Sequence, residues 1–92
     1  MLVIAYHKIH DIDIFWSEAK AVGENPPAGF KLHQIHPCQN MQSGTSLWEV
    51  PSMHAFSKFL DDRVGGISKN YFYKVTSKAA IGLPTELNKV VN

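Results

Sequence analysis

The order of strand-like and helix-like segments is the feature that most limits how this chain can fold. Four segments are short and rich in β-branched and aromatic residues, as expected of strands: residues 2–9, 30–38, 45–50 and 71–76. Two segments carry apolar side chains at the spacing of one helix face: residues 12–22 and 52–64. The predicted order is therefore strand, helix, strand, strand, helix, strand.

Capping residues and glycines mark the ends of the predicted helices. Asp11 and Asp13 are both suited to cap the first helix, because each brings a carboxylate to the positive end of the helix dipole. Gly23 is expected to end that helix. Ser52 is the predicted N-cap of the second helix, which is expected to end at Gly65.

This order of elements is the plan of the ferredoxin-like α+β fold, a four-stranded antiparallel sheet with two helices on one face. A chain of 92 residues has room for one core and none for a separate second domain. We expect a single domain over residues 1–80. Residues 81–92 contain few apolar side chains and are predicted to form an extended or partly disordered tail.

Composition and charge exclude several classes of partner. The formal charge is +1 and no stretch gathers Lys or Arg into a stripe, so a nucleic-acid partner is not expected. No apolar run approaches the length of about 20 residues that a membrane helix requires. Cys38 is the single cysteine and the first residues lack a signal-peptide pattern, which favours a cytoplasmic location. No neighbour in sequence argues for a lowered pKa of the Cys38 thiol.

The register of the hairpin formed by the second and third strands decides which side chains meet. With a turn centred near Met41, Glu49 lies opposite His33, and Trp48 faces the helices. A slip of one residue would pair Glu49 with Gln34 and place Trp48 on a half-polar face, which is less consistent with an apolar face under the helices. The face away from the helices is then predicted to carry apolar side chains that nothing in the chain covers: Leu47, Ile35 and Phe72. A second copy of the sheet is the natural cover, so we expect a homodimer.

Two strands carry a resemblance to a known superfamily. The strand Ser46-Leu47-Trp48-Glu49-Val50, which leads straight into the second helix, and the closing strand Tyr71-Phe72-Tyr73-Lys74-Val75 resemble those of the dimeric α+β barrel proteins over residues 1–80. Around Trp48, Glu49 and Val50 the chain is most similar to small uncharacterised or nickel-binding members. The superfamily also includes cofactor-free monooxygenases and isomerases, so the resemblance implies the fold and a dimer and leaves the function open.

The chain is rich in histidine, which is the commonest metal ligand and the side chain that most readily moves protons near neutral pH. Five positions carry it: His7, His10, His33, His36 and His54. His7 with His10, and His33 with His36, share the spacing His-x-x-His. Because that spacing points the two members to opposite faces of a strand, neither pair forms a chelate by itself. The simpler interpretation of the five histidines is that they have structural roles.

The most specific candidate site combines His33 with Glu49, supported by His7 on the neighbouring first strand. A carboxylate that accepts from one imidazole nitrogen fixes the tautomer and raises the basicity of the ring, as both a metal ligand and a general base require. The simpler alternative is a cross-strand charge pair. As a metal site, His7, His33 and Glu49 would bind a divalent ion such as nickel or zinc.

Tyr6 and Trp48 are candidates to line a cavity for a small-molecule ligand together with those three residues, although large aromatic residues are more often plain core. No complete catalytic set is visible in the sequence, so a small-molecule or metal-binding protein without catalysis is the leading hypothesis. A small cofactor-free enzyme of the monooxygenase or isomerase kind, using the His/Glu pair, is the alternative. Convergence of the residues on a metal-sized gap would favour the first hypothesis, and an organic-sized cavity the second.

Overall fold

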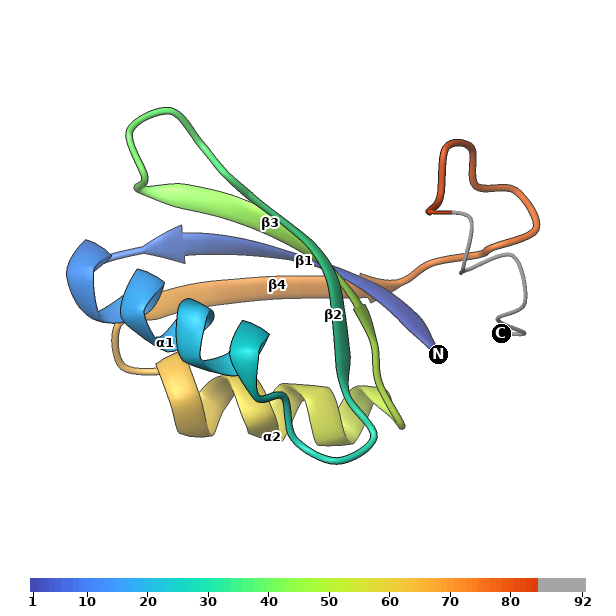
Figure 1. Cartoon of the computed structure of the whole chain (residues 1–92), viewed down its shortest axis with the longest axis horizontal. Helices are drawn as coiled ribbons and strands as arrows, with labels where there is room; N and C mark the ends of the chain where they lie inside the picture. Colours follow the sequence, from blue (N-terminus) through green and yellow to red (C-terminus); the bar gives the residue numbers. More distant parts are fainter. Residues whose placement is uncertain (85–92) are drawn as a thin grey trace.

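A computed structural model describes residues 1–84 and confirms the predicted order of elements. The elements are β1 (Leu2–Ile9), α1 (Ile12–Glu24), β2 (Lys31–Pro37), β3 (Ser43–Glu49), α2 (Met53–Val64) and β4 (Ser68–Lys74). The four strands pair antiparallel in the order β2-β3-β1-β4 (Figure 1). The fold is therefore ferredoxin-like α+β, with β1 and β3 at the centre of the sheet and β2 and β4 at its edges.

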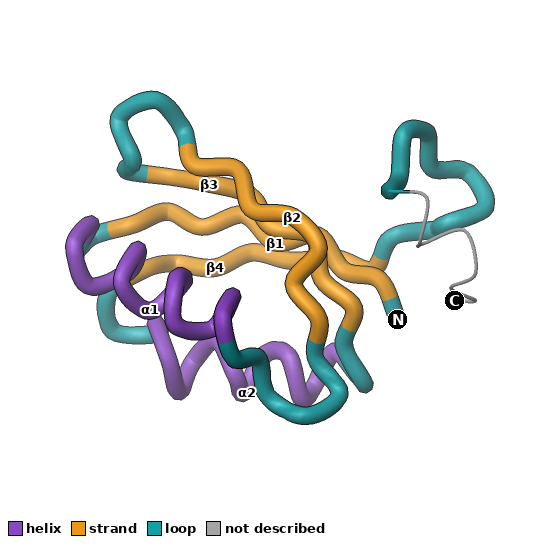
Figure 2. The backbone as a smooth tube through the Cα atoms, viewed as in Figure 1, coloured by secondary structure: helices purple, strands orange, loops and turns teal. Residues whose placement is uncertain are grey.

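Both helices lie on one face of the sheet, and the main core lies between the two layers (Figure 2). Its centre is an aromatic cluster in which Phe56 is fully buried and lies 5.5 Å from Trp48 and 5.3 Å from Phe72, measured between ring centroids. Alternate residues of β1, namely Val3, Ala5 and Ile9, pack into the same core. This alternation fixes which side chains of β1 reach the space under the helices.

The predicted helix caps are confirmed, with one change at a helix end. Asp11 caps α1 by accepting from the backbone N–H of Ile14 at 3.1 Å, and Ser52 caps α2 as predicted. The prediction that Gly23 ends α1 is wrong, since the helix continues to Glu24 and is capped by Asn25. A single glycine inside a helix costs only about 1 kcal/mol, which packing of the helix on the sheet offsets.

Strand β4 begins earlier than the sequence indicates, at Ser68 rather than at Tyr71. Ser68 and Asn70 have the composition of a loop, but they pair with Ile9 and His7 of β1. The polar side chain of Asn70 is accommodated because it bonds to His7. A buried polar partner thus overrides the low strand propensity of these residues.

The predicted register of the hairpin is wrong because β2 contains a bulge. Near the turn Gln34 pairs with Leu47 and Ile35 with Ser46, and the register shifts between Leu32 and Gln34. The extra residue returns Leu32 to the helix face opposite Trp48, as expected. No period-two pattern reveals a bulge, because its extra residue changes the alternation of faces.

The predicted set of uncovered apolar residues is also wrong. Phe72 packs against Phe56 in the helix-side core, and Ile35 lines a pocket under the helices. Leu47 does lie on the opposite face, but it is buried in a second small cluster. In their place, that face exposes three tyrosines, which we call the tyrosine face: Tyr6, Tyr71 and Tyr73, with exposed fractions of 44%, 57% and 60%.

The second cluster joins the sheet to the segment after β4. Leu2, Leu47 and Val75 form its buried part, and Ala80 and Leu83 pack against them. The predicted tail therefore includes one residue, Leu83, that packs against the sheet, and residues 85–92 lie outside the described residues. Within residues 1–84, no helix is long and apolar enough to cross a membrane.

Candidate functional site

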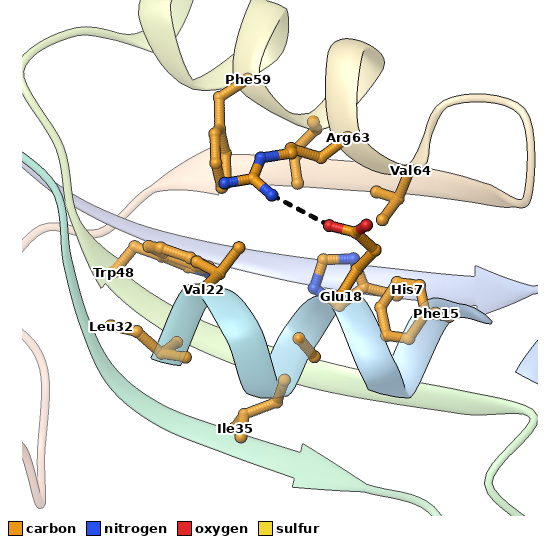
Figure 3. Close-up of a pocket in the computed structure, with 12 residues that line it drawn as sticks. His7, Phe15, Glu18, Val22, Leu32, Ile35, Trp48, Phe59, Arg63 and Val64 are labelled. Atoms are coloured by element: carbon orange, nitrogen blue, oxygen red, sulfur yellow. Dashed lines mark hydrogen bonds and ion pairs between the residues drawn. The ribbon is translucent and has the colours of Figure 1, made fainter. Parts of the chain in front are cut away.

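A pocket opens between α1, α2 and the sheet, beside the aromatic core (Figure 3). Most of the side chains that line it are apolar: Phe15, Ala19, Val22, Leu32, Ile35, Trp48, Phe59, Leu60 and Val64. The polar residues of the lining are His7, Glu18 and Arg63. An apolar pocket with a few convergent polar groups is the usual form of a small-molecule site.

The size of the pocket sets what it can hold. The part of the pocket that a water-sized molecule can enter has a volume of about 40 Å³. The whole empty volume, with the opening toward solvent included, is about 410 Å³. The inner part is therefore large enough for a few water molecules or one small apolar group. A longer molecule would fill the inner part with one end and leave its other end between the helices.

His7 is the buried polar residue of this pocket, with an exposed fraction of only 3%. Its Nδ1 lies 2.8 Å from Oδ1 of Asn70 on β4, and its Nε2 lies 2.8 Å from Oγ of Ser46 on β3. Trp48 donates its indole N–H to the same Ser46 Oγ at 2.7 Å. The ring of His7 also lies 5.2 Å from that of Phe15 on α1. Side chains of the two neighbouring strands, β3 and β4, and of α1 thus hold the imidazole in one orientation.

The hydrogen bonds assign the tautomer of His7. Asn70 donates its amide N–H to the carbonyl oxygen of Ser68 at 3.4 Å, which turns Oδ1 of Asn70 toward His7. Nδ1 of His7 must therefore carry the proton and donate it. Nε2 of the neutral ring is then an acceptor, and the hydroxyl of Ser46 donates to it.

Burial lowers the pKa of His7 below its usual value of 6.5, and the hydrogen bond with Asn70 offsets part of this effect. The imidazole is therefore neutral at physiological pH. A neutral ring with a fixed tautomer has its Nε2 lone pair directed at a defined point, which suits hydrogen-bond recognition or proton abstraction.

Ser46, His7 and Asn70 have the connectivity of a nucleophilic triad, but Ser46 is not placed to act as a nucleophile. Its exposed fraction is 1%, and it is absent from the lining of the pocket. It lies inside β3, where the backbone N–H groups belong to the sheet ladder, so they do not form an oxyanion hole. The Ser46 hydroxyl thus serves to orient His7.

Glu18 and Arg63 form the charged mouth of the pocket. Nη1 of Arg63 on α2 donates to Oε2 of Glu18 on α1 at 3.0 Å, and both side chains are partly exposed (Figure 3). The guanidinium carbon of Arg63 also lies 5.9 Å from the ring centroid of Phe59. The ion pair links the two helices across the entrance.

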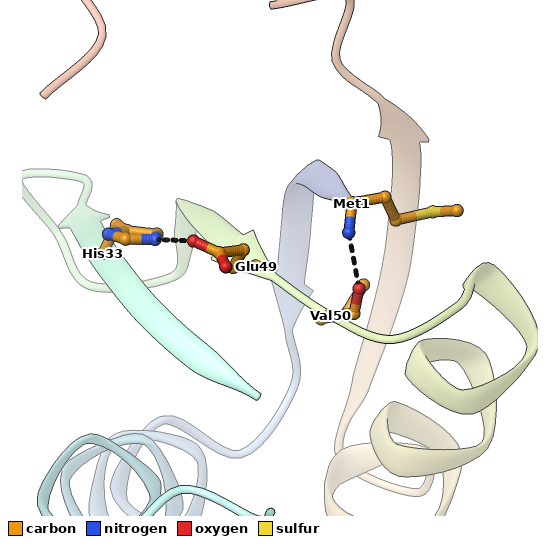
Figure 4. Close-up of polar contacts among 4 residues, drawn as sticks. All are labelled: Met1, His33, Glu49 and Val50. Carbon is orange, nitrogen blue, oxygen red and sulfur yellow. Dashed lines mark hydrogen bonds and ion pairs between the residues drawn. The ribbon is translucent and has the colours of Figure 1, made fainter. Parts of the chain in front are cut away.

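The predicted contact between His33 and Glu49 is present, on the face of the sheet away from the pocket (Figure 4). Nε2 of His33 lies 3.0 Å from Oε1 of Glu49, although Glu49 is paired in register with Lys31. His33 occupies the bulge, and the bulge aims its side chain at the carboxylate.

Val50, the residue after Glu49, bonds to the start of the chain (Figure 4). The N-terminal amine of Met1 donates to the carbonyl oxygen of Val50 at 2.7 Å, which joins β1 to the end of β3.

The structure divides the predicted site residues between two faces. His7 and Trp48 line the helix-side pocket, whereas His33 and Glu49 lie on the other face with Tyr6. Tyr6 stacks on Tyr71 with a centroid distance of 6.3 Å and lines no part of the pocket under the helices. Within residues 1–84, no group of three His, Cys, Asp or Glu side chains is placed to hold a metal ion.

Cys38 differs from the expectation of an ordinary thiol. Hydrogen bonding from Ser43 lowers the pKa of the thiol to about 7, and backbone N–H groups of Ser43, Asn40 and Gln42 add to the effect. These donors lie in the loop between β2 and β3 and at Ser43, the first residue of β3, whose backbone N–H lies 3.3 Å from the sulfur. Charged neighbours are the usual sequence signal for a reactive thiol, so a loop that supplies only backbone and hydroxyl donors gives none.

Sequence reasoning missed Ser46, Asn70 and the Glu18–Arg63 pair as parts of a site. Ser46 and Asn70 lie on strands whose registers place them beside His7, and a strand register is not visible in one sequence. The alternation of Ser46 with Leu47, and of Asn70 with Tyr71, is the available signal, because it puts polar residues on the core face.

A scan of protein-family models, a search of curated proteins and a search of solved structures each found no match to this chain. The geometry of the site is therefore the basis on which a function is inferred.

Proposed function

We propose that this protein binds a small, mostly apolar organic molecule in the pocket between the helices and the sheet. The observation that carries the proposal is a nearly apolar pocket with one buried, neutral histidine whose tautomer is fixed by Asn70 and Ser46. Perturbed titratable groups in an apolar pocket are typical of ligand sites. His7 is the group that recognises a polar atom of the ligand.

The Nε2 atom of His7 is the recognition point in this proposal. Its partner is the hydroxyl of Ser46, which rotates about its C–O bond and also accepts from Trp48. A ligand hydroxyl can donate to Nε2 only after the Ser46 side chain turns its Oγ away from His7, while Asn70 keeps Nδ1 in place. The ligand is thus expected to combine an apolar ring or chain with a hydrogen-bond donor.

Catalysis without a cofactor is the second candidate, because the same neutral imidazole is oriented as a general base. Asn70 holds the proton on Nδ1, which leaves Nε2 to abstract a proton from a bound molecule. This version uses His7 in place of the His/Glu pair. Binding leads because a base also needs a second group to stabilise the charge that develops on the substrate.

The metal-binding hypothesis has less support than the organic ligand. His33 and Glu49 offer one nitrogen and one carboxylate, and the proposed third ligand, His7, faces the helices. A nickel or zinc ion at the pair would need donors from outside this set. Calorimetric titration with nickel and zinc checks it, and binding that is lost in His33→Ala would support it.

Membership of the dimeric α+β barrel superfamily, with a homodimer formed through the tyrosine face, is part of the same proposal. The fold and the sequence resemblance support it, and so do Tyr6, Tyr71 and Tyr73, whose rings are large and exposed in the single chain. We also propose a cytoplasmic location, which the free thiol of Cys38 supports.

The binding proposal is tested by filling the pocket without disturbing the His7 network. Ala19 lines the pocket from α1, whereas Ala21 on the same helix is exposed and does not. We expect phenol to shift the amide NMR signals of Phe15, Trp48 and Phe59 in the unchanged protein and in Ala21→Leu, with a dissociation constant on the order of millimolar for so small a ligand. Ala19→Leu should remove the shifts. Shifts that persist in Ala19→Leu, or that cluster on the tyrosine face, would contradict the proposal.

A further inference from the structure

The charged residues of the pocket gather at its mouth, and this placement bears on the class of ligand. Glu18 and Arg63 extend from different helices to meet across the entrance, while the lining further in is apolar apart from His7 (Figure 3). A ligand longer than the inner space leaves its outer end beside these two side chains. The outer end of the ligand must therefore displace either Glu18 from Arg63 or Arg63 from Glu18.

The ion pair is easily replaced. The side chains of Arg63 and Glu18 have exposed fractions of 41% and 36%, so solvent screens their attraction. A single hydrogen bond, from Nη1 to Oε2, joins them. A guanidinium has five N–H donors arranged to match the two oxygens of a carboxylate, so this contact uses a small part of what Arg63 offers.

Arg63 has a second anchor and Glu18 does not, among the contacts of the described residues. The guanidinium lies against the ring of Phe59, which keeps it at the pocket wall without using its N–H donors. Glu18 is held by Arg63 alone. When the pair opens, Arg63 stays at the mouth and Glu18 is released to solvent. The asymmetry favours an anionic ligand over a cationic one.

Resting on the proposed function, we infer that the ligand is a small organic acid. Its apolar ring or chain lies between Phe15, Trp48 and Phe59, and its carboxylate takes the place of Glu18 on Arg63. Because a carboxylate can make two parallel hydrogen bonds to the guanidinium, it outcompetes the single bond of Glu18. Entry of the ligand then separates α1 from α2 at the one ion pair that links them across the mouth.

The test compares an acid with its uncharged isostere. We expect 3-(4-hydroxyphenyl)propanoate to bind about tenfold more tightly than 3-(4-hydroxyphenyl)propanamide in calorimetric titration, since a charge-assisted contact is the stronger one. Arg63→Gln should remove this preference, so that the acid and the amide bind equally tightly. Glu18→Gln should tighten binding of the acid, because the internal competitor is lost. Lys58→Gln, which removes an exposed charge elsewhere on α2, is the matched control and should change neither affinity.

The other outcomes of this experiment would each contradict the inference. Equal binding of acid and amide to the unchanged protein, or a preference that survives in Arg63→Gln, overturns the inference and leaves the apolar pocket standing. Tighter binding of 3-(4-hydroxyphenyl)propylamine than of the acid overturns it in favour of Glu18 as the recognition group. Binding of none of the three, with circular dichroism showing an intact fold, overturns the proposed function together with the inference.

Discussion

At the scale of single residues, His7 shows how one buried polar side chain can be accommodated in a small core. Within residues 1–84, every buried side-chain nitrogen and oxygen atom has a hydrogen-bond partner. His7 reaches this state through Asn70 and Ser46, which come from the strands on either side of it. The imidazole therefore stays neutral and oriented in the folded protein, whereas in the unfolded chain it titrates as an ordinary histidine.

The first prediction concerns pH. Because burial lowers the pKa of His7 below 6.5, the unfolded chain binds more protons than the folded protein as the pH falls below 6.5. The contribution of His7 to the free energy of unfolding is thus fully present above that pH and decreases as the pH falls toward the lowered pKa. Nitrogen-15 NMR of the histidine rings should show the Nδ1-protonated tautomer and a titration midpoint below 6.5. A midpoint at or above 6.5 would rule out the assigned network.

The residue scale also shows where sequence reasoning succeeded and failed. His7 and Trp48, which were chosen as candidate site residues, line the pocket under the helices, and the contact between His33 and Glu49 was correctly predicted. The assembly of His7 with that pair was not, because alternation along β1 turns His7 to the helices while the bulge keeps His33 on the other face. One side chain's neighbours depend on three strand registers, and a sequence gives none of them directly.

At the scale of elements, α1 is tied to the hairpin of β2 and β3 by Trp16. Its indole N–H donates to the carbonyl oxygen of Met41 at 2.8 Å, and its ring lies over Gly44. A Cβ atom at Gly44 would lie 3.1 Å from Cη2 of Trp16 and 3.0 Å from the carbonyl oxygen of His36. The helix can approach the hairpin this closely only because residue 44 has no side chain.

The second prediction follows from this close approach. Gly44→Ala should lower the free energy of unfolding by about 1–3 kcal/mol, since the added methyl group forces Trp16 or the backbone of β2 to move. Gly66→Ala is the matched control, because a Cβ atom there meets nothing within 4 Å. Urea unfolding followed by tryptophan fluorescence measures both. Equal stability of the two variants would contradict the prediction, because it would show that the hairpin accommodates the methyl group without a loss in the free energy of unfolding.

Elements were predicted better than the contacts between them. Apolar periodicity and caps such as Asp11 and Ser52 located both helices, because these signals are local. The start of β4 was missed because Ser68 and Asn70 are strand residues only in the presence of β1. Pairing partners far apart in the sequence, and not local propensity, decide such an edge.

At the scale of the whole molecule, one face of the sheet is covered by the helices, and the other face is partly covered by the chain and partly exposed. The segment after β4 packs over Leu2, Leu47 and Val75 at one end of that face. The three exposed tyrosines lie elsewhere on that face, which also carries His33 and Glu49. The expectation of a dimer was derived from Leu47, Ile35 and Phe72, which are all accounted for within the chain, so the tyrosine face now carries that proposal.

The third prediction is that charges on the tyrosine face separate the dimer. The double variant Tyr71→Lys and Tyr73→Lys should sediment as a monomer at micromolar concentration, where the unchanged protein should sediment as a dimer. Both side chains are exposed in the single chain, so the fold should be retained. Ile14→Lys, at an exposed apolar position on the outer side of α1, is the control and should remain dimeric. A monomer for the unchanged protein would contradict the proposal.

The bonds between Asn70, His7 and Ser46 have a further consequence, which concerns how the chain reaches its fold. If β1 slipped by one residue, Lys8 or Tyr6 would turn toward the helices in place of His7. If it slipped by two, Ala5 or Ile9 would stand beside Asn70 and leave two polar side chains without a partner. Each such orphan costs about 1–3 kcal/mol in a dry core. His7 therefore helps to specify the register of β1, because it destabilises near-native strand alignments that apolar packing alone would tolerate.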